Sequence, residues 1–210
     1  MSELPAVSVI IPVYNVEKYL PKCLDSLLGQ TMANIEAVCV DDASTDRSGK
    51  ILEQYAARDG RVKFFSSDGN AGPGRARNLG LEKATGEYVM FCDPDDWFEP
   101  DAVETAYRRI AENGNDFAYF NTYIYMEDSG RQNADAHRLA PFAEVFGKPA
   151  LRLHELTPPF IRTSESWYKI YRNSFCRAEV VRGYSVFYES GGYRIYTDLG
   201  LNPGNVNSFL

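Results

Sequence analysis

Three aspartates crowd a short segment that directly follows a predicted strand. Asp93, Asp95 and Asp96 lie within four positions, behind the largely apolar run Glu87–Phe91. Like charges this close repel one another unless a cation or a hydrogen-bond donor lies among them. Carboxylate oxygens are hard ligands that suit Mg²⁺ or Mn²⁺, and such ions usually hold substrate phosphates. The segment therefore predicts a site for a metal ion and a phosphate, with a solvated acidic turn as the alternative.

The three carboxylates have different predicted roles within this cluster. We expect Asp95 to bind the metal ion. Asp93 would either share the ion or bind the ribose hydroxyls of a nucleotide, and Asp96 would support the ligands from behind.

Residues suited to binding a nucleotide base follow two other predicted strands, in segments 11–15 and 40–46. Asp42 stands at a strand end, where its carboxylate can accept a hydrogen bond from an N–H group of a base. The aromatic ring of Tyr14 can stack on a planar base. Helix capping is the alternative for Asp42, and packing in the core is the alternative for Tyr14.

A glycine-rich loop lies before the helix that is predicted to begin at Pro73, and it is suited to binding a phosphate group. It is the fourth segment with candidate site residues. Gly69, Gly72 and Gly74 allow the backbone to approach a ligand closely, and a helix N-terminus favours an anion. Arg77 follows on the helix and is a candidate ligand for a diphosphate. An ordinary flexible loop and a solvated arginine are the alternatives.

The elements that position these residues alternate between strand and helix patterns. Strands are expected at 7–11, 35–40, 62–65 and 87–91. Helices are expected from a cap at Asn15 to about Gly29, after a cap at Ser44 or Asp46, at 73–84 and at 100–112. This alternation predicts an α/β fold with a mostly parallel sheet and helices on both faces. Ligands of such sheets collect beyond the carboxyl ends of the strands, so all four segments should meet in one crevice.

The second half of the chain gives weaker patterns. Residues 117–125 are expected to form a strand and residues 127–138 a loop, whereas the chain from Gly183 onward has no assignable pattern.

Composition narrows the functional class. The chain has 210 residues with 22 basic and 29 acidic side chains, a formal net charge of −7, which argues against a nucleic-acid partner. The four cysteines lack metal-ligand spacing and are expected to be buried free thiols. We expect neither a signal peptide nor a membrane-spanning run, so the expected location is the cytoplasm.

The motifs together resemble those of the family 2 glycosyltransferases, especially bacterial members that build surface polysaccharides. The resemblance covers about residues 6–105 and rests on four segments in the family's order and spacing: 8–15, 40–46, 76–80 and 86–97. Residues 166–172 are similar to a weaker downstream motif of the same members.

This resemblance implies a GT-A (Rossmann-like) fold and a nucleotide-diphosphate sugar donor, most often a UDP-sugar. It implies that Asp42 contacts the base and that Pro12 and Tyr14 form the walls of the base pocket. It also implies that Asp95 holds a divalent metal, Mn²⁺ or Mg²⁺, that bridges the diphosphate. Members invert the anomeric centre by direct displacement with one carboxylate as the base. Residues 1–112 would then form a nucleotide-sugar-binding half, and residues 113–210 an acceptor-side half of the same domain.

The chain departs from the family pattern in its last segment. A Glu-Asp pair usually supplies the base there; here Asp198 is the candidate general base and Glu189 the other available carboxylate. The family is also usually longer, which leaves open a truncated chain, a shortened homologue or a degenerate copy. The expected function is sugar transfer to a saccharide or lipid-linked acceptor in cell-surface polysaccharide synthesis. Where that acceptor is membrane-bound, the protein would associate peripherally with the inner face of the membrane. The alternatives are a non-catalytic nucleotide-sugar-binding remnant and, ranked lower, a sugar nucleotidyltransferase.

Overall fold

The structure is a computed structural model that describes residues 4–114, 117–119, 123–126, 131–134, 169–174 and 176. Within these ranges the chain forms, in order, β1 (Val7–Val13), α1 (Leu20–Leu28), β2 (Ile35–Asp41), α2 (Ser48–Arg58), β3 (Val62–Ser66), α3 (Pro73–Lys83), β4 (Tyr88–Phe91), α4 (Ala102–Asn113), β5 (Phe117–Tyr119), β6 (Tyr123–Met126), β7 (Arg131–Ala134) and β8 (Lys169–Arg172).

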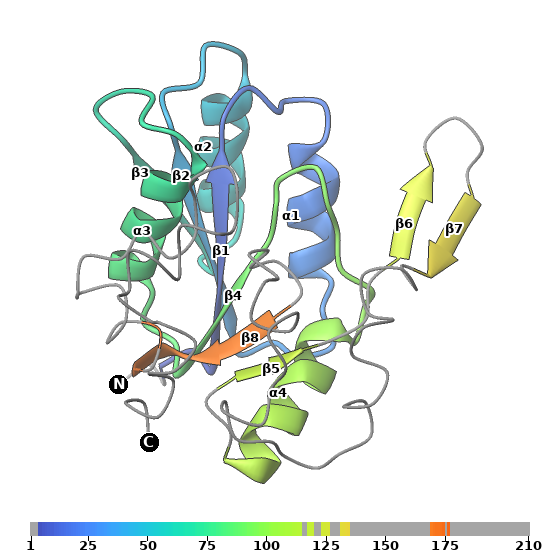
Figure 1. Cartoon of the computed structure of the whole chain (residues 1–210). Coiled ribbons are helices and arrows are strands. Elements are labelled where there is room, and N and C mark those ends of the chain that lie inside the picture. Colours follow the sequence, from blue (N-terminus) through green and yellow to red (C-terminus); the bar gives the residue numbers. More distant parts are fainter. Residues whose placement is uncertain are drawn as a thin grey trace, which may run out of the picture.

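A mixed sheet with the order β3-β2-β1-β4-β8-β5 forms the centre of the molecule. Its first four strands are parallel, and Ile10 of β1 pairs with Val38 of β2 on one side and Phe91 of β4 on the other. Strand β8 runs antiparallel to both β4 and β5. The predicted α/β fold with a mostly parallel sheet is therefore confirmed (Figure 1).

Helices cover both faces of this sheet, as predicted. All seven residues of β1 are buried, which is typical of a strand that is covered on both sides. Val9 and Ile11 pack in one cluster with residues of α1, α2 and α4, whereas Ile10 packs in a second cluster with Leu81 of α3. Each such fully buried aliphatic side chain contributes about 1.5–3 kcal/mol to the stability of the fold.

Close approach of α3 to the sheet depends on a glycine. A Cβ atom on Gly80 would lie 2.4 Å from Cγ2 of Ile10, so any larger residue would push the helix outward. Because α3 begins at the crevice, this contact helps to fix the position of its first turn.

The start of α1 differs from the prediction. Asn15 does not cap the helix, which begins at Leu20 with Pro21 in its first turn, where a missing N–H costs nothing. Asn15 instead has a positive φ of 51°, and its side-chain oxygen accepts a hydrogen bond from the backbone of the loop before α2. Asn tolerates this left-handed conformation better than most residues, which allows the sharp turn at the end of β1.

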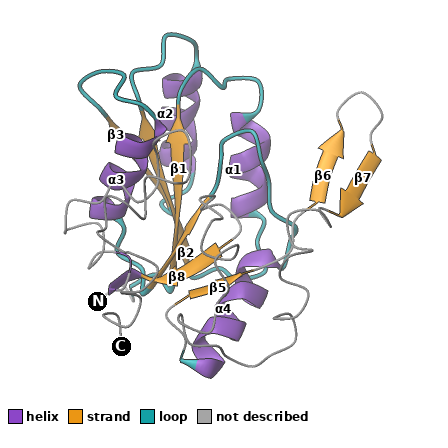
Figure 2. Cartoon of the chain, viewed as in Figure 1, coloured by secondary structure: helices purple, strands orange, loops and turns teal. Residues whose placement is uncertain are grey.

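The single strand predicted over 117–125 is also wrong. Its residues divide between β5, in the main sheet, and β6, which pairs with β7 in a separate antiparallel hairpin. Strand β7 lies inside the region predicted as a loop, and its polar sequence Arg-Gln-Asn-Ala carries no strand propensity. Figure 2 shows this hairpin outside the main sheet, on the α1 side of the molecule.

Strands from the second half complete the sheet begun by the first half. Both β5 and β8 come from beyond residue 112, and Asn173 ties the end of β8 to the turn before β4 through a bond from Nδ2 to the Gly86 carbonyl of 2.7 Å. The division of function at residue 112 stays a prediction. In the part of the chain that the structure describes, no helix has both the length and the apolar character that a membrane crossing requires.

Candidate functional site

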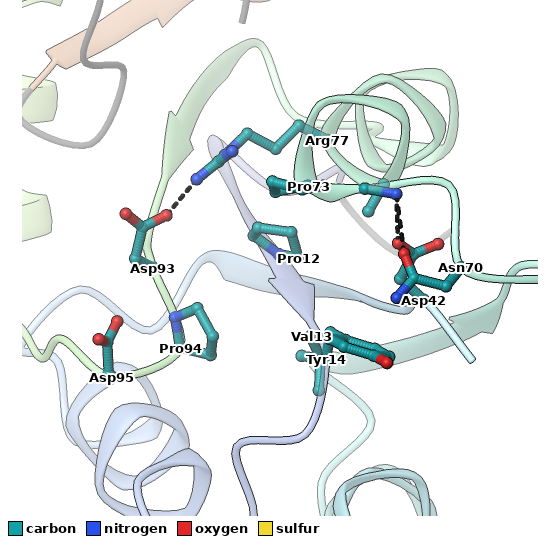
Figure 3. Close-up of a pocket in the computed structure, with 12 residues that line it drawn as sticks. Pro12, Val13, Tyr14, Asp42, Asn70, Pro73, Arg77, Asp93, Pro94 and Asp95 are labelled. Atoms are coloured by element: carbon teal, nitrogen blue, oxygen red, sulfur yellow. Dashed lines mark hydrogen bonds and ion pairs between the residues drawn. The ribbon is translucent and has the colours of Figure 1, made fainter. Parts of the chain in front are cut away.

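The four segments singled out in the sequence meet in one pocket of about 350 Å³ (Figure 3). The pocket lies beyond the carboxyl ends of β1, β2 and β4 and at the beginning of α3, as expected for a parallel sheet. Its lining residues are Pro12, Val13, Tyr14, Asp42, Asn70, Gly72, Pro73, Ala76, Arg77, Asp93, Pro94 and Asp95. Figure 3 shows Asp42 on one side of the end of β1 and Asp93 and Asp95 on the other.

Asp42 is buried, with 2% of its surface exposed, and its carboxylate is held by the glycine-rich loop. The hydroxyl of Ser67 donates to Oδ1 at 2.8 Å, the N–H of Ala71 donates to Oδ1 at 3.0 Å, and the N–H of Gly72 donates to Oδ2 at 2.7 Å. These donors stabilise the buried negative charge. Gly72 has a φ of 87°, which only glycine adopts easily, so the loop can turn its N–H groups towards Asp42.

Pro12 and Tyr14 lie beside Asp42 at the end of β1. Tyr14 is 44% exposed, so the alternative of burial in the core is wrong for this residue. An exposed ring next to a buried carboxylate offers a flat apolar surface and a hydrogen-bond acceptor together. That combination suits the face and the edge of a nucleotide base.

Arg77 forms an ion pair with Asp93 across the pocket. The side chain of Arg77 is 3% exposed, and its guanidinium group donates through Nη2 to Oδ1 of Asp93, whose side chain is 27% exposed. The alternative of a solvated arginine is therefore wrong, because Arg77 is buried where α3 packs against the sheet. The predicted contact between Arg77 and a diphosphate stays a prediction, and the pairing adds a second role, which is to hold Asp93 in place.

Asp95 is the exposed carboxylate of the pocket, on a turn closed by a 3.0 Å bond from the Asp96 N–H to the Asp93 carbonyl. In the described ranges, no group of three or more His, Cys, Asp or Glu side chains could enclose a metal ion. Mg²⁺ and Mn²⁺ do not need such a group, because they are commonly held by one or two carboxylates together with phosphate oxygens. The residues present therefore fit a divalent ion that arrives with a diphosphate.

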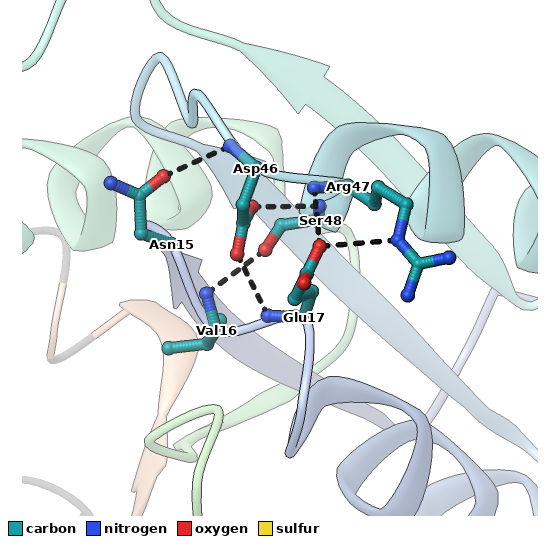
Figure 4. Close-up of polar contacts among 6 residues, drawn as sticks. All are labelled: Asn15, Val16, Glu17, Asp46, Arg47 and Ser48. Carbon is teal, nitrogen blue, oxygen red and sulfur yellow. Dashed lines mark hydrogen bonds and ion pairs between the residues drawn. The ribbon is translucent and has the colours of Figure 1, made fainter.

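A network of hydrogen bonds fixes the end of β1 against the start of α2 (Figure 4). Oδ1 of Asn15 accepts bonds from the backbone N–H groups of Thr45 at 2.8 Å and Asp46 at 3.3 Å. The carboxylate of Asp46 accepts from the N–H groups of Glu17 at 3.0 Å and Ser48 at 2.8 Å. The N-cap residue of α2 is Arg47, so the prediction that Ser44 or Asp46 caps this helix is wrong, although Asp46 binds the N–H of its first residue. Burial raises the pKa of Asp46, but its hydrogen bonds from Ser48 and Glu17 outweigh that effect and hold the pKa below the ordinary value. Apart from an Asn at a strand end, no residue pattern predicts this network directly.

Two cysteines lie directly behind the acidic turn. The sulfur atoms of Cys23 on α1 and Cys92 after β4 are 3.7 Å apart, and all four cysteines of the chain are buried free thiols, as predicted. The hydrogen bond to Cys23 and burial hold the pKa of the Cys92 thiol well above its ordinary value. Both residues therefore act as small apolar side chains under the site.

The predicted general base cannot be related to this geometry. Asp198 and the alternative Glu189 lie outside the described residues.

Fold and pocket together define an α/β protein with a pocket beyond the strand ends, and comparison with known proteins gives the family. A family model described as "Glycosyl transferase family 2" matches residues 8–190, and the chain belongs to this family. The glycosyltransferase GlyA of Streptococcus pneumoniae is 49% identical over 124 residues, which cover 59% of this chain and 18% of GlyA. Chondroitin synthase of Escherichia coli is 41% identical over 104 residues, which cover 50% of this chain and 15% of that protein.

A solved structure extends the likeness to most of the fold. Residues 1–349 of TarS from S. aureus, crystallised in complex with UDP-GlcNAc, superpose with a TM-score of 0.68 at 31% identity. The match covers 83% of this chain and 47% of that structure. The predicted GT-A fold is confirmed. The chain spans less than two thirds of the length of each of these relatives.

Proposed function

We propose that this protein is an inverting glycosyltransferase that moves a sugar from a nucleotide-diphosphate sugar, most favourably a UDP-sugar, to a hydroxyl group of an acceptor in cell-surface polysaccharide synthesis. The observation that supports this most directly is the convergence of Asp42, Asp93 and Asp95 on one pocket. The nucleotide-sugar donor is consistent with the UDP-GlcNAc bound by TarS, and polysaccharide synthesis is consistent with chondroitin synthase among the relatives.

The base and the diphosphate would occupy opposite ends of the pocket. Tyr14 and Pro12 would flank the base, and Asp42 would accept its N–H in addition to the loop donors, because a carboxylate has about four acceptor sites. The diphosphate would reach towards Arg77 and the acidic turn. Asp95 would hold the divalent ion, and Asp93, fixed by Arg77, would share it or bind the ribose.

Mn²⁺ or Mg²⁺ held in this way would neutralise the negative charge that develops on the departing diphosphate. The residues of the chain have to do the rest: they orient the donor and remove a proton from the acceptor hydroxyl. In our proposal Asp198 is the base that takes this proton, so that the hydroxyl attacks the anomeric carbon from the face opposite the diphosphate. The acceptor is a saccharide or a lipid-linked saccharide, and the expected location is the cytoplasm, at the inner face of the membrane where the acceptor is membrane-bound.

The metal assignment is tested by calorimetric titration of UDP with and without Mn²⁺. UDP binding should be stronger with Mn²⁺ in the wild-type protein, and Asp95→Ala should abolish that difference. Asp68→Ala is the matched control, because it removes an equal charge from an exposed residue of the neighbouring loop that does not line the pocket. Equal UDP affinity with and without Mn²⁺ in the wild type would exclude Asp95 as a metal ligand.

Catalysis is tested separately from binding. Hydrolysis of a panel of UDP-, GDP- and TDP-sugars in the presence of Mn²⁺ should identify the donor. Binding of UDP without hydrolysis or transfer of any donor would favour the non-catalytic nucleotide-sugar-binding alternative.

A further inference from the structure

Three side chains from separate elements meet beside the acidic turn and are not used by the nucleotide pocket. The ammonium group of Lys22, on α1, lies 3.1 Å from the ring centroid of Trp97 and 5.0 Å from that of Tyr125. The Trp97 and Tyr125 rings meet edge to face, with centroids 5.1 Å apart and an interplanar angle of 76°. We call these three residues the aromatic platform.

The platform is adjacent to the proposed reaction centre. Trp97 follows Asp95 by two residues, so their Cα atoms are separated by at most about 7 Å. This distance is on the order of the width of one sugar ring. A saccharide that rests on the platform would therefore reach a donor sugar attached to a diphosphate at Asp95.

The platform remains open to solvent, unlike a packed core. Tyr125 is 40% exposed, Lys22 is exposed and Trp97 is half-buried. Isolated exposed aromatic residues are common on protein surfaces. Here two rings and a cation converge from α1, the loop after β4 and the β6–β7 hairpin, which otherwise lies outside the main sheet.

The chemistry of the platform matches that of a sugar ring. A pyranose presents an apolar face of C–H groups, which packs on an aromatic ring, and a rim of hydroxyl groups. The N–H donors of Lys22 that point away from Trp97 can bind such hydroxyl oxygens. An ammonium group next to the acidic turn also reduces the local negative charge that would otherwise repel an acidic acceptor.

We propose that the platform of Lys22, Trp97 and Tyr125 is the subsite for the acceptor saccharide, with the sugar ring packed on Tyr125 and Trp97 and its hydroxyls bound by Lys22. This inference rests on the proposed glycosyl transfer and deepens it, because it assigns the acceptor side of the reaction to named residues.

The test uses the fluorescence of Trp97 as a direct probe. Trp97 and Trp167 are the two tryptophans of the chain, so Trp167→Phe leaves one emitter. N-acetylchitotetraose, cellotetraose and a tetrasaccharide that contains uronic acid are titrated in this background up to about 10 mM, which saturates a site of millimolar affinity. We expect a saturable change with at least one of them. Absence of a saturable change with all three overturns the proposal.

Variants then assign the binding to the platform. Tyr125→Ala and Lys22→Met should each weaken saccharide binding by roughly 5- to 10-fold. Methionine keeps most of the length of Lys22 on Trp97, so this variant remains informative if Tyr125→Ala fails to fold. Lys18→Met is the matched control, because Lys18 lies 4.7 Å over the ring of Tyr19 in a similar pair that is not part of the platform. Unchanged binding in Lys22→Met, or equal weakening in Lys18→Met, overturns the proposal.

Calorimetry with UDP and Mn²⁺ on the same preparations separates the two proposals. Wild-type affinity for UDP together with lost saccharide binding is the result expected for platform variants. If UDP binds but no saccharide does, the acceptor subsite is wrong and the donor assignment stands. If UDP does not bind the wild type, the proposed function itself fails.

Discussion

The change Asp42→Asn should release the glycine-rich loop from the pocket. Asn has nearly the same shape as Asp, so packing is retained and only the hydrogen-bonding character changes. The carboxylate of Asp42 accepts bonds on both oxygens, from Ser67 and Ala71 on Oδ1 and from Ala71 and Gly72 on Oδ2. An amide keeps one acceptor oxygen and places an NH₂ group where the other was, so at least one donor then faces another donor.

The expected cost follows from the number and type of these bonds. A hydrogen bond to a charged group contributes about 1.5–3 kcal/mol, and a buried donor left without an acceptor costs about 1–3 kcal/mol. Losing one such bond at a residue that is 2% exposed should therefore cost roughly 2–4 kcal/mol in the stability of the closed loop. This corresponds to about a 30- to 700-fold shift in the equilibrium between closed and open loop.

Hydrogen exchange of the Ala71 and Gly72 amides measures this shift directly, and calorimetry with UDP shows its effect on the pocket. Asp41→Asn is the matched control, because the side chain of Asp41 accepts one bond from the N–H of Ser44, at 3.1 Å on Oδ1, which an Asn oxygen can also accept. We expect protection of Ala71 and Gly72 to fall in Asp42→Asn and to stay near wild type in Asp41→Asn. Equal protection in both variants would refute the role of Asp42 as the anchor of the loop.

Two further predictions concern the other charged groups of the site. Arg77→Met should lower the free energy of unfolding by roughly 3 kcal/mol, which is the low end for a broken buried pair because Asp93 is partly exposed. Urea unfolding of a double-mutant cycle with Asp93→Asn measures the coupling between the two residues, and additive costs would contradict the pairing. The pKa of Asp46 is lower in the folded state, so its stabilising effect is present above the ordinary carboxyl pKa of 3.8 and is lost as pH falls through the lower folded-state value. The difference in unfolding free energy between wild type and Asp46→Asn should thus be constant near neutral pH and shrink below about pH 4, whereas a difference that grows on acidification would contradict the hydrogen-bond assignment.

The first half of the fold and most of the pocket could be predicted because the governing signals are local. Buried parallel strands are read from short apolar runs, such as the one that ends at Phe91. The carboxyl ends of parallel strands lie at one edge of the sheet. The proximity of Asp42 and Asp95 could therefore be predicted without knowledge of any contact between residues. The predicted roles of these two residues also required only the chemistry of a carboxylate.

The missed features depend on contacts between residues far apart in the chain. Lys22 and Tyr125 both contact the indole of Trp97 although about half the chain separates them, and no periodicity in the sequence predicts this contact. Arg77 has the sequence context of an exposed helical residue, but the packing of α3 against β1 and β2 buries it. The polar strand β7 forms because β6 offers it a partner, which is tertiary context overriding propensity.

The three carboxylates that line the pocket are chemically distinct because the fold treats each one differently. Asp42 is surrounded by N–H and O–H donors, and Asp93 is held by the guanidinium group of Arg77. Asp95, on the same turn as Asp93, is exposed. Since an incoming cation competes least with existing partners at an exposed carboxylate, Asp95 is the strongest candidate ligand among the three. Arg77 also places positive charge at the end of the pocket where the diphosphate would lie, in a chain whose net charge of −7 would otherwise oppose an anionic donor.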